Sequence, residues 1–311
     1  MNRHHPHRST RRAVLGTGLA LGLGGGRAVH AQATPGASPV ADTGYARPEM
    51  LVDAIWLCDQ LDDPSVLAVG LMPAGTFADG AIPGSMQIDW PDLEVTDTSD
   101  DSLAAWQATV EDHLTRLGLT RDRTVVAYDE GTLFAARLWW VLHYLGHERV
   151  HVLNGGLPAW IEAGYEVATG QPALVAADEP YVGAAQPDAL AQVPEVEAAI
   201  GDADTVIVDA RTPDEYAAGH VPGAVNINYP LNAEPDAPKF WKPAGDLKRL
   251  YGEAGVTPDR WVIPYCSTGV RSAVTSFTLW LIGYDDVSLF TGSWAEWTLD
   301  PERPVTTGDA P

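Results

Sequence analysis

The chain carries one sequence pattern twice, and this duplication constrains its fold more than any other feature. Three pairs of segments align without a gap: 66–85 with 205–224, 124–140 with 261–277, and 154–160 with 291–297. The offset between the copies is 139 residues in the first pair (208 − 69) and 137 in the other two (265 − 128). Because chance matches would not keep register across separated blocks, the sequence predicts one fold present twice, a duplication rather than a solenoid of many repeats.

Each copy alternates short apolar runs with longer helix-like segments. The predicted strands are the runs at 66–69, 124–128 and 150–153 in the first copy and at 205–208, 261–265 and 287–290 in the second. Helix-like segments such as 102–117 and 134–145 lie between them. This alternation indicates an α/β fold in which each copy holds a central parallel sheet with helices on both faces. Pro264 cannot donate a ladder hydrogen bond, so we expect a strand boundary near it.

The two copies are joined and preceded by segments of a different composition. Residues 168–194 contain four prolines and many alanines, which is typical of a linker. The first domain is therefore predicted at 48–167 and the second at 195–304. Residues 32–47 are rich in Pro, Gly, Ser and Ala, and we expect them to form a flexible lead-in.

The N-terminus has the order of an export signal. Residues 1–12 hold four arginines and no acid, and an apolar glycine-rich run follows at 13–26, before small residues suited to cleavage. The pair Arg11 and Arg12 resembles the twin-arginine signal, whose route exports folded proteins. An ordinary secretory signal with a chance arginine pair is the alternative. The apolar run is too short to span a bilayer, so we expect residues 1–31 to be removed and the mature protein to be periplasmic or extracellular, without a membrane anchor.

Charge and cysteine content exclude several classes of function. The formal net charge is −23 at pH 7, so nucleic acid and anionic membrane surfaces are poor partners. With Cys58 and Cys266 the only two cysteines, no disulfide framework is expected, and Cys58 lies in an apolar helix-like stretch typical of an inert core thiol. No His, Cys, Asp or Glu cluster has metal-ligand spacing and no glycine-rich nucleotide loop is present, so no metal or other cofactor is expected.

The loop after the predicted strand at 261–265 is the candidate site. Ligands of parallel α/β sheets bind beyond the carboxyl ends of the strands, and Cys266 follows such an end, ahead of a helix-like segment at 272–282. Backbone N–H groups there favour negative charge, and thus a thiolate, the nucleophilic form of cysteine. Arg271 can add a bidentate donor for an oxyanion. The backbone groups expected around the sulfur are those of Ser267, Thr268, Gly269, Val270 and Arg271.

The first copy lacks these chemical groups. Asp129 stands at the position of Cys266, and Phe134 stands at that of Arg271. Because the register of the repeat is unbroken there, the fold itself does not require a cysteine and an arginine. A role other than packing therefore accounts for both residues.

The second copy carries three motifs: DARTPDEYAAGHVPGA at 209–224, YCSTGVR at 265–271 and GSWAEW at 292–297. Together they resemble the tandem-domain rhodaneses, a family of sulfurtransferases, and the resemblance spans residues 48–304. It implies two rhodanese-like domains, an inactive first and a catalytic second, with the site in the cleft between them. It also implies an enzyme in which Cys266 takes a sulfane sulfur from thiosulfate as a persulfide and passes it to cyanide or a thiol, with ping-pong kinetics.

The resemblance also bears on other activities. Phosphatases related to this fold have a loop one residue longer between cysteine and arginine, so the four residues between Cys266 and Arg271 favour sulfur transfer. Enzymes that prefer 3-mercaptopyruvate typically have a small or polar residue where Arg271 stands and a histidine where the first copy has Ala81. Both departures favour thiosulfate over 3-mercaptopyruvate as the donor. A non-catalytic rhodanese-like binding module is the remaining alternative.

The donor anion needs cationic partners near the loop. Arg271 is the first candidate and Arg211 the second; for Arg211, a structural ion pair with Asp209 or Glu215 is an equal alternative. His220 is expected to make a structural hydrogen bond beside its Val-Pro-Gly turn.

Overall fold

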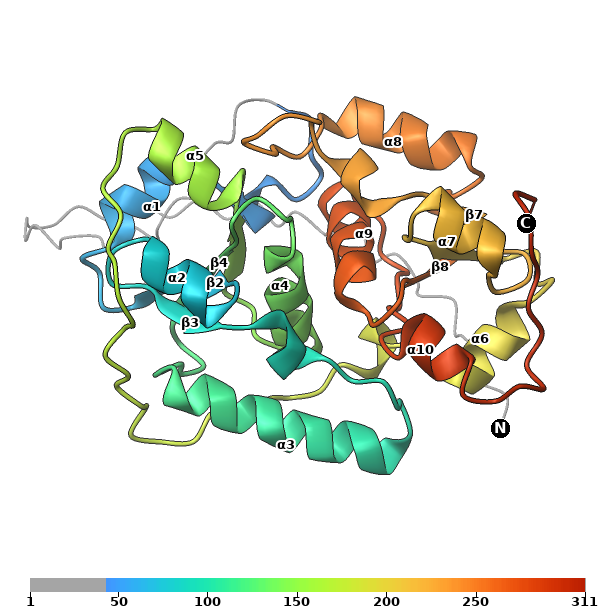
Figure 1. Ribbon diagram of the computed structural model, residues 1–311, viewed down its shortest axis with the longest axis horizontal. Coiled ribbons are helices and arrows are strands. Elements are labelled where there is room, and N and C mark those ends of the chain that lie inside the picture. Colours follow the sequence, from blue (N-terminus) through green and yellow to red (C-terminus); the bar gives the residue numbers. More distant parts are fainter. Residues whose placement is uncertain (1–42, 311) are drawn as a thin grey trace, which may run out of the picture. The chain divides into compact units, whose positions relative to one another are not determined.

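The computed structural model describes residues 43–310 (Figure 1). The predicted export signal at 1–31 lies outside the described residues, as does most of the predicted lead-in at 32–47. Within residues 43–310, no helix combines the length and the apolar character needed to cross a bilayer.

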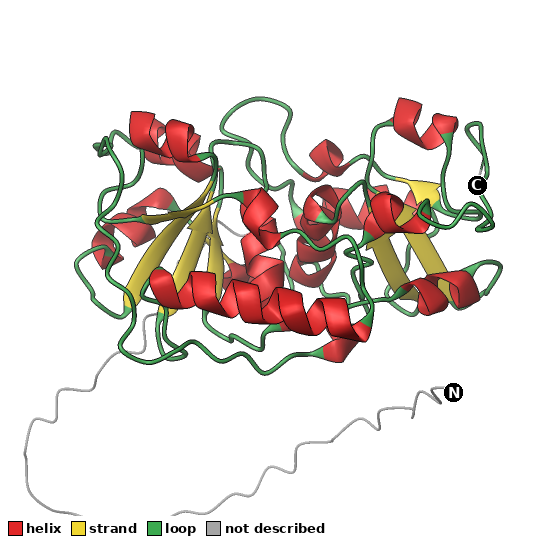
Figure 2. Cartoon of the chain, turned by 60° about the horizontal axis from the view of Figure 1, so that its bottom comes forward, coloured by secondary structure: helices red, strands yellow, loops and turns green. Residues whose placement is uncertain are grey.

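The first copy forms a parallel sheet of five strands in the order β1-β5-β4-β2-β3, whose strands run side by side between helices (Figure 2). The strands are β1 (Leu51–Val52), β2 (Val66–Leu71), β3 (Met86–Ile88), β4 (Thr124–Tyr128) and β5 (Val150–Leu153). β4 and β5 match the predicted bounds, and β2 extends the predicted 66–69 by two residues. The predicted parallel sheet is confirmed.

Helices cover both faces of this sheet because alternate strand residues are apolar on both sides. The helices are η1 (Pro48–Met50), α1 (Ala54–Gln60), α2 (Ala74–Asp79), η2 (Trp90–Leu93), α3 (Asp100–Arg116), α4 (Ala135–Tyr144) and α5 (Gly156–Glu162). Leu67 and Val69 of β2 join the core that contains α3 and α4. Val66 and Ala68 of the same strand join the core that contains α1, α2 and α5.

The second copy has a smaller sheet in the order β7-β6-β8, formed by β6 (Thr205–Asp209), β7 (Val225–Asn226) and β8 (Trp261–Tyr265). The predicted strand at 287–290 lies beside β8 but makes only one isolated bridge to it among residues 43–310, between Val287 and Val262. The N–H of Ser288 donates to the carbonyl of Val262, and the N–H of Phe290 donates to the carbonyl of Pro264, both at 3.0 Å. Pro264 has no N–H and so cannot donate to the neighbouring segment. The first copy has Ala127 at the position of Pro264, and its β4–β5 ladder is continuous. β8 ends at Tyr265, one residue after Pro264, where a strand boundary was expected. The missing N–H explains why the predicted strand at 287–290 forms no continuous ladder with β8.

The remaining helices of the second copy surround this sheet. They are η3 (Pro187–Ala189), α6 (Val193–Ala199), α7 (Pro213–Ala218), η4 (Tyr229–Asn232), α8 (Ala244–Glu253), α9 (Val270–Leu281) and α10 (Ser293–Trp297). α4 of the first copy packs against α9 of the second, where the rings of Trp139 and Phe277 meet edge to face with centroids 5.0 Å apart. One apolar core thus continues from the first domain into the second.

The segments outside the two domains are held by backbone hydrogen bonds. In the predicted linker at 168–194, Ala168 pairs with Ala81 and the N–H of Ala184 donates to the carbonyl of Leu145 at 2.8 Å, so this part of the linker lies along the first domain. Its end joins the second domain, where Leu190 pairs with Leu289. Within the predicted lead-in, Tyr45 is buried and its hydroxyl donates to the carbonyl of Trp241 at 3.0 Å. The described end of the lead-in, residues 43–47, is therefore anchored on the second domain rather than free.

Candidate active site

The loop after β8 begins with Cys266, whose side chain is 1% exposed. The N–H of Gly269 donates to Cys266 Sγ at 3.2 Å. α9 begins at Val270, two residues before the predicted start, so the sulfur lies in one tight turn at the helix N-terminus. The amides of residues 267–271 were all expected around the sulfur. Within residues 43–310, the backbone hydrogen bond to Sγ comes from Gly269 alone. The thiol is thus buried, yet a backbone donor points at it rather than away.

Gly269 is the residue that this turn requires. Its φ is +89°, in the left-handed region that side chains disfavour. A Cβ on Gly269 would also lie 2.6 Å from the carbonyl oxygen of Thr291, a contact that backbone atoms do not tolerate. The loop can therefore close over the sulfur only with glycine here.

Ser293, at the start of α10, holds the loop from the other side. The N–H of Cys266 donates to Ser293 Oγ at 3.1 Å, and this hydroxyl donates to the carbonyl of Phe290 at 2.9 Å. Ser293 has φ +57°, a conformation that costs a residue with a side chain, and these two hydrogen bonds stabilise it. This contact was not predicted from the sequence. The signal was available, because the first copy has Gly156 at the equivalent position.

Arg271 lies in the first turn of α9 and forms a bidentate pair with Glu215. Both guanidinium–carboxylate distances are 2.8 Å, and Nη2 of Arg271 also donates to Ser267 Oγ at 2.6 Å. Hydrogen bonds from Arg271 and Thr212 hold the pKa of Glu215 well below its usual range. Glu215 and the nearby Cys266 in turn hold the pKa of Arg271 above its usual range. The structure therefore brings Arg271 to the cysteine loop, as predicted, and adds a carboxylate partner.

Arg211 is buried beside Trp294 and pairs with Asp209. Its Nη2 donates to Asp209 Oδ2 at 2.6 Å and to the carbonyl of Gly219 at 2.7 Å, while its guanidinium lies 4.4 Å from the Trp294 ring. Asp209 also accepts from the hydroxyl of Tyr265, the last residue of β8, at 2.6 Å. The structural ion pair weighed from the sequence is present, with Asp209 as partner. Contact of Arg211 with substrate stays a prediction.

His220 makes the structural hydrogen bond expected of it. The ring is fully buried, its Nδ1 lies 2.9 Å from the carbonyl oxygen of Tyr216, and it stacks on the Tyr216 ring at 3.7 Å. These contacts fix the turn that follows α7.

The equivalent loop of the first copy holds a carboxylate in place of the thiol. Asp129 Oδ1 accepts from the N–H groups of Gly131 at 2.7 Å and Thr132 at 2.9 Å, and Oδ2 accepts from that of Ala135 at 2.8 Å. Burial raises the pKa of Asp129, and these backbone donors oppose the rise. The turn therefore offers donors to an acidic group in both copies.

A family model for the rhodanese-like domain matches residues 53–163 and again residues 192–300, covering both copies. The chain belongs to the rhodanese family. The predicted family and fold are thereby confirmed, with two rhodanese domains in tandem.

Relatives within the family carry sulfurtransferase names. A thiosulfate sulfurtransferase of Pseudomonas aeruginosa is 33% identical over 265 residues, which cover 82% of this chain and 96% of that protein. A probable 3-mercaptopyruvate sulfurtransferase of the same species is 37% identical over 205 residues, 62% of this chain and 70% of that protein. These relatives support a sulfurtransferase function and leave the donor open.

The fold is also shared with solved structures. An anaerobic ergothioneine biosynthesis enzyme from Chlorobium limicola superposes with a TM-score of 0.74 at 23% identity, over 85% of this chain and 71% of that one. At this identity the likeness concerns the fold alone.

A side chain of the first rhodanese domain reaches the second domain, and it was not predicted from the sequence. Arg137 of α4 is fully buried and donates from Nη1 to Thr291 Oγ1, in the second rhodanese domain, at 2.9 Å. The second copy has Val274 at the equivalent position. This departure from the repeat, like that at Cys266, was the available signal.

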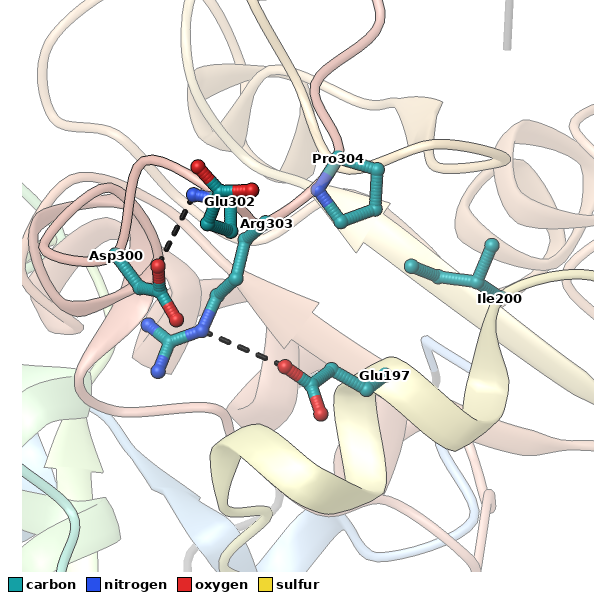
Figure 3. Close-up of a pocket in the computed structure, with 6 residues that line it drawn as sticks. All are labelled: Glu197, Ile200, Asp300, Glu302, Arg303 and Pro304. Atoms are coloured by element: carbon teal, nitrogen blue, oxygen red, sulfur yellow. Dashed lines mark hydrogen bonds and ion pairs between the residues drawn. The ribbon is translucent and has the colours of Figure 1, made fainter.

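A surface pocket lies elsewhere on the second rhodanese domain (Figure 3). It is lined by α6 and the segment after α10, with an ion pair between Arg303 and Glu197 at 3.5 Å. None of the predicted site residues lines this pocket. The candidate active site is therefore the cysteine loop.

Proposed function

We propose that the protein is a thiosulfate sulfurtransferase in which Cys266 carries the transferred sulfur as a persulfide. The single observation that carries this proposal is the hydrogen bond from the Gly269 N–H to Cys266 Sγ at the N-terminus of α9. A helix N-terminus and an aligned amide favour an anion, and the thiolate is the reactive form of cysteine.

The proposed first half-reaction loads the enzyme. The thiolate of Cys266 attacks the sulfane sulfur of thiosulfate, a new S–S bond forms, and the bond from the sulfane sulfur to the sulfonate sulfur breaks. Sulfite leaves with the electron pair of that bond. In the second half-reaction cyanide takes the terminal sulfur as thiocyanate, and the thiolate of Cys266 is restored; a thiol acceptor would leave as a persulfide. Charge balances in each half, and the order of events gives ping-pong kinetics.

Arg271 is the proposed partner of the donor's sulfonate end. Its side chain is 20% exposed, and Glu215 and Ser267 hold it beside the loop. The first rhodanese domain has no cation at this place in its own loop, since Phe134 stands there. For Arg211, the pair with Asp209 supports a positioning role beneath β8 in preference to direct donor contact.

A second candidate donor is 3-mercaptopyruvate, favoured by the 37% identity to a probable 3-mercaptopyruvate sulfurtransferase. Arg271 and Ala81 weigh against it, because the resemblance associates that activity with other residues at both positions.

A side-by-side assay tests the donor. Purified protein is supplied with thiosulfate or with 3-mercaptopyruvate at equal concentration, with cyanide as acceptor, and thiocyanate is measured. Faster turnover with thiosulfate is expected; faster turnover with 3-mercaptopyruvate rejects thiosulfate as the preferred donor. Mass spectrometry after thiosulfate alone should find one added sulfur at Cys266 that cyanide removes. Absence of that addition would favour a non-catalytic binding module.

We also propose that the protein is exported to the periplasm or beyond, on the strength of the arginine-rich and apolar N-terminal sequence. Cell fractionation of the full chain tests this, with Arg11→Lys and Arg12→Lys together as the matched variant. Export that continues unchanged in the variant would indicate an ordinary secretory signal, and retention of the full chain in the cytoplasm would contradict export.

A further inference from the structure

Arg137 is a fully buried cation whose hydrogen-bond partners are neutral. Nη1 donates to Thr291 Oγ1, Nη2 donates to the carbonyl of Leu93, and the guanidinium lies 4.8 Å from the Trp140 ring. Nε has no partner within the described structure. Burying a charge without a counter-charge is among the most costly arrangements in a protein, so the site calls for an anion.

Carboxylates do not supply that anion directly. Among residues 43–310, no Asp or Glu oxygen lies within ion-pair distance of Arg137. Glu94 follows η2, and one of its carboxylate oxygens is buried without a hydrogen-bond partner. Burial lowers the pKa of Arg137 to about 10, and the charges of Cys266 and Glu94 oppose this, with Cys266 the larger of the two.

Arg137 meets the catalytic loop at Gly269. A Cβ on Gly269 would lie 3.3 Å from Arg137 Nη1, while the N–H of the same Gly269 points at Cys266 Sγ. Thr291, which accepts from Arg137, also borders Gly269 through its carbonyl oxygen. One residue of the loop therefore donates to the sulfur and lies beside the guanidinium.

The two arginines near the loop differ in how much charge they present. Arg271 is closely neutralised by the bidentate carboxylate of Glu215. Arg137 has no such partner in the described chain and is shielded from water, so its field at the loop is less reduced. The charges of Arg271, Asp129 and Cys266 all act on the hydroxyl of Tyr229 of η4, so these groups share one electrostatic environment. Asp129 adds negative charge to this environment, which increases the need for a compensating cation.

We propose that Arg137, from the non-catalytic rhodanese domain, is the buried counter-charge of the anionic sulfur on Cys266. It acts through Gly269 and Thr291 as a positioning residue, and its role applies to the thiolate and to the persulfide alike. The persulfide half of this proposal rests on the proposed function, whereas the thiolate half does not. The first domain thereby takes part in the chemistry without a catalytic group of its own.

The test follows the reactivity of Cys266 toward iodoacetamide as a function of pH. A Cys58→Ser background leaves Cys266 as the single thiol. In Arg137→Gln the midpoint of the alkylation profile should rise by about one pH unit, because the thiolate loses a nearby cation. Arg137→Lys keeps the charge and should restore most of the shift.

Arg123→Gln is the matched control. Arg123 also lies in the first rhodanese domain and also donates to two carbonyl groups, those of Gly118 and Val66, but it has no contact with the loop. Its loss should leave the midpoint unchanged. An unchanged midpoint in a folded Arg137→Gln protein overturns the proposal, as does failure of Arg137→Lys to restore it.

Two further measurements keep the outcome clear. If Arg137→Gln does not fold, Thr291→Val removes one hydrogen bond to Arg137 and should raise the midpoint by a smaller amount; no shift there overturns the proposal. Sulfur loading from thiosulfate is measured separately by mass spectrometry. Absence of loading in the unaltered protein rejects the proposed function. The thiolate half of this proposal is then still decided by the alkylation result.

Discussion

The loop at Asp129 and the loop at Cys266 form the same turn with different chemistry. In the first domain, three backbone N–H groups satisfy a buried carboxylate. In the second, one N–H points at a thiol, and Ser293 and Arg271 hold the turn from either side. A turn that places donors around an acidic group is therefore a property of the duplicated fold. Reactivity depends on which acidic group occupies it and on the cations nearby.

The two loops are also close to a common neighbour. Burial raises the pKa of Tyr229 of η4, Arg271 opposes this rise, and the negative charges of Asp129 and Cys266 add to it. Tyr229 is therefore within electrostatic reach of both loops. The packing of α4 on α9 is what brings the loops together, since each helix begins at the end of its own loop. The non-catalytic domain thus forms part of the environment of the sulfur.

Replacing Cys266 removes the reactive group that distinguishes the second loop from the first. We expect Cys266→Ser to reduce thiosulfate:cyanide sulfur transfer by roughly 10³-fold or more, because a hydroxyl cannot take up and release the sulfur. Far-UV circular dichroism should be unchanged, since serine is close to cysteine in volume. Cys58→Ser is the matched control and should retain full activity. Turnover within tenfold of the unaltered protein would reject Cys266 as the nucleophile.

Removing Arg271 tests the cation that the first loop lacks. Arg271→Ala should raise the KM for thiosulfate about tenfold, because a charge-assisted contact with the sulfonate is lost, with a much smaller change in the KM for cyanide. Steady-state kinetics with each substrate varied in turn gives both constants. Arg249→Ala removes an arginine from an exposed ion pair and should change neither. Equal increases for both substrates would count against donor binding by Arg271.

Neutralising Asp129 tests how much the first loop gains from binding its own carboxylate. Asp129→Asn turns one acceptor into a donor that faces the N–H of Ala135, so we expect the free energy of unfolding to fall by about 1–3 kcal/mol. The kcat for sulfur transfer should stay within a factor of about three, because Asp129 does not react. Urea unfolding measures the loss, and Asp63→Asn, in the turn after α1, should change the stability much less. An unchanged stability would contradict the view that the first loop binds its own carboxylate.

The smallest effect is expected from the partner of Arg271. The pKa of Glu215 is lowered in the folded protein, so its contribution to stability is present above the pKa it has when unfolded and is lost as pH falls through the folded value. From about pH 7 to about pH 3, the free energy of unfolding should therefore fall less steeply in Glu215→Gln than in the unaltered protein. The difference should be under about 1 kcal/mol, since Glu215 is partly exposed. Glu253→Gln, at an exposed site on α8, should keep the original slope, and identical slopes in both variants would show that the ion pair adds no stability.

The positions of several strands, and of the cysteine that follows one of them, could be predicted from the repeated sequence. Apolar runs fixed in register by the duplication predicted β4, β5 and β8 to the residue, and Cys266 at the end of β8 followed from them. The strand boundary expected near Pro264 lies one residue after it, because a missing N–H is a local property of the residue. The partners that lie far apart in the chain depend on the tertiary structure instead. Glu215 meets Arg271 and Arg137 meets Thr291 across 56 and 154 positions of the chain. Such pairs leave no periodic trace in the sequence, because they form only when separate segments of the chain pack together.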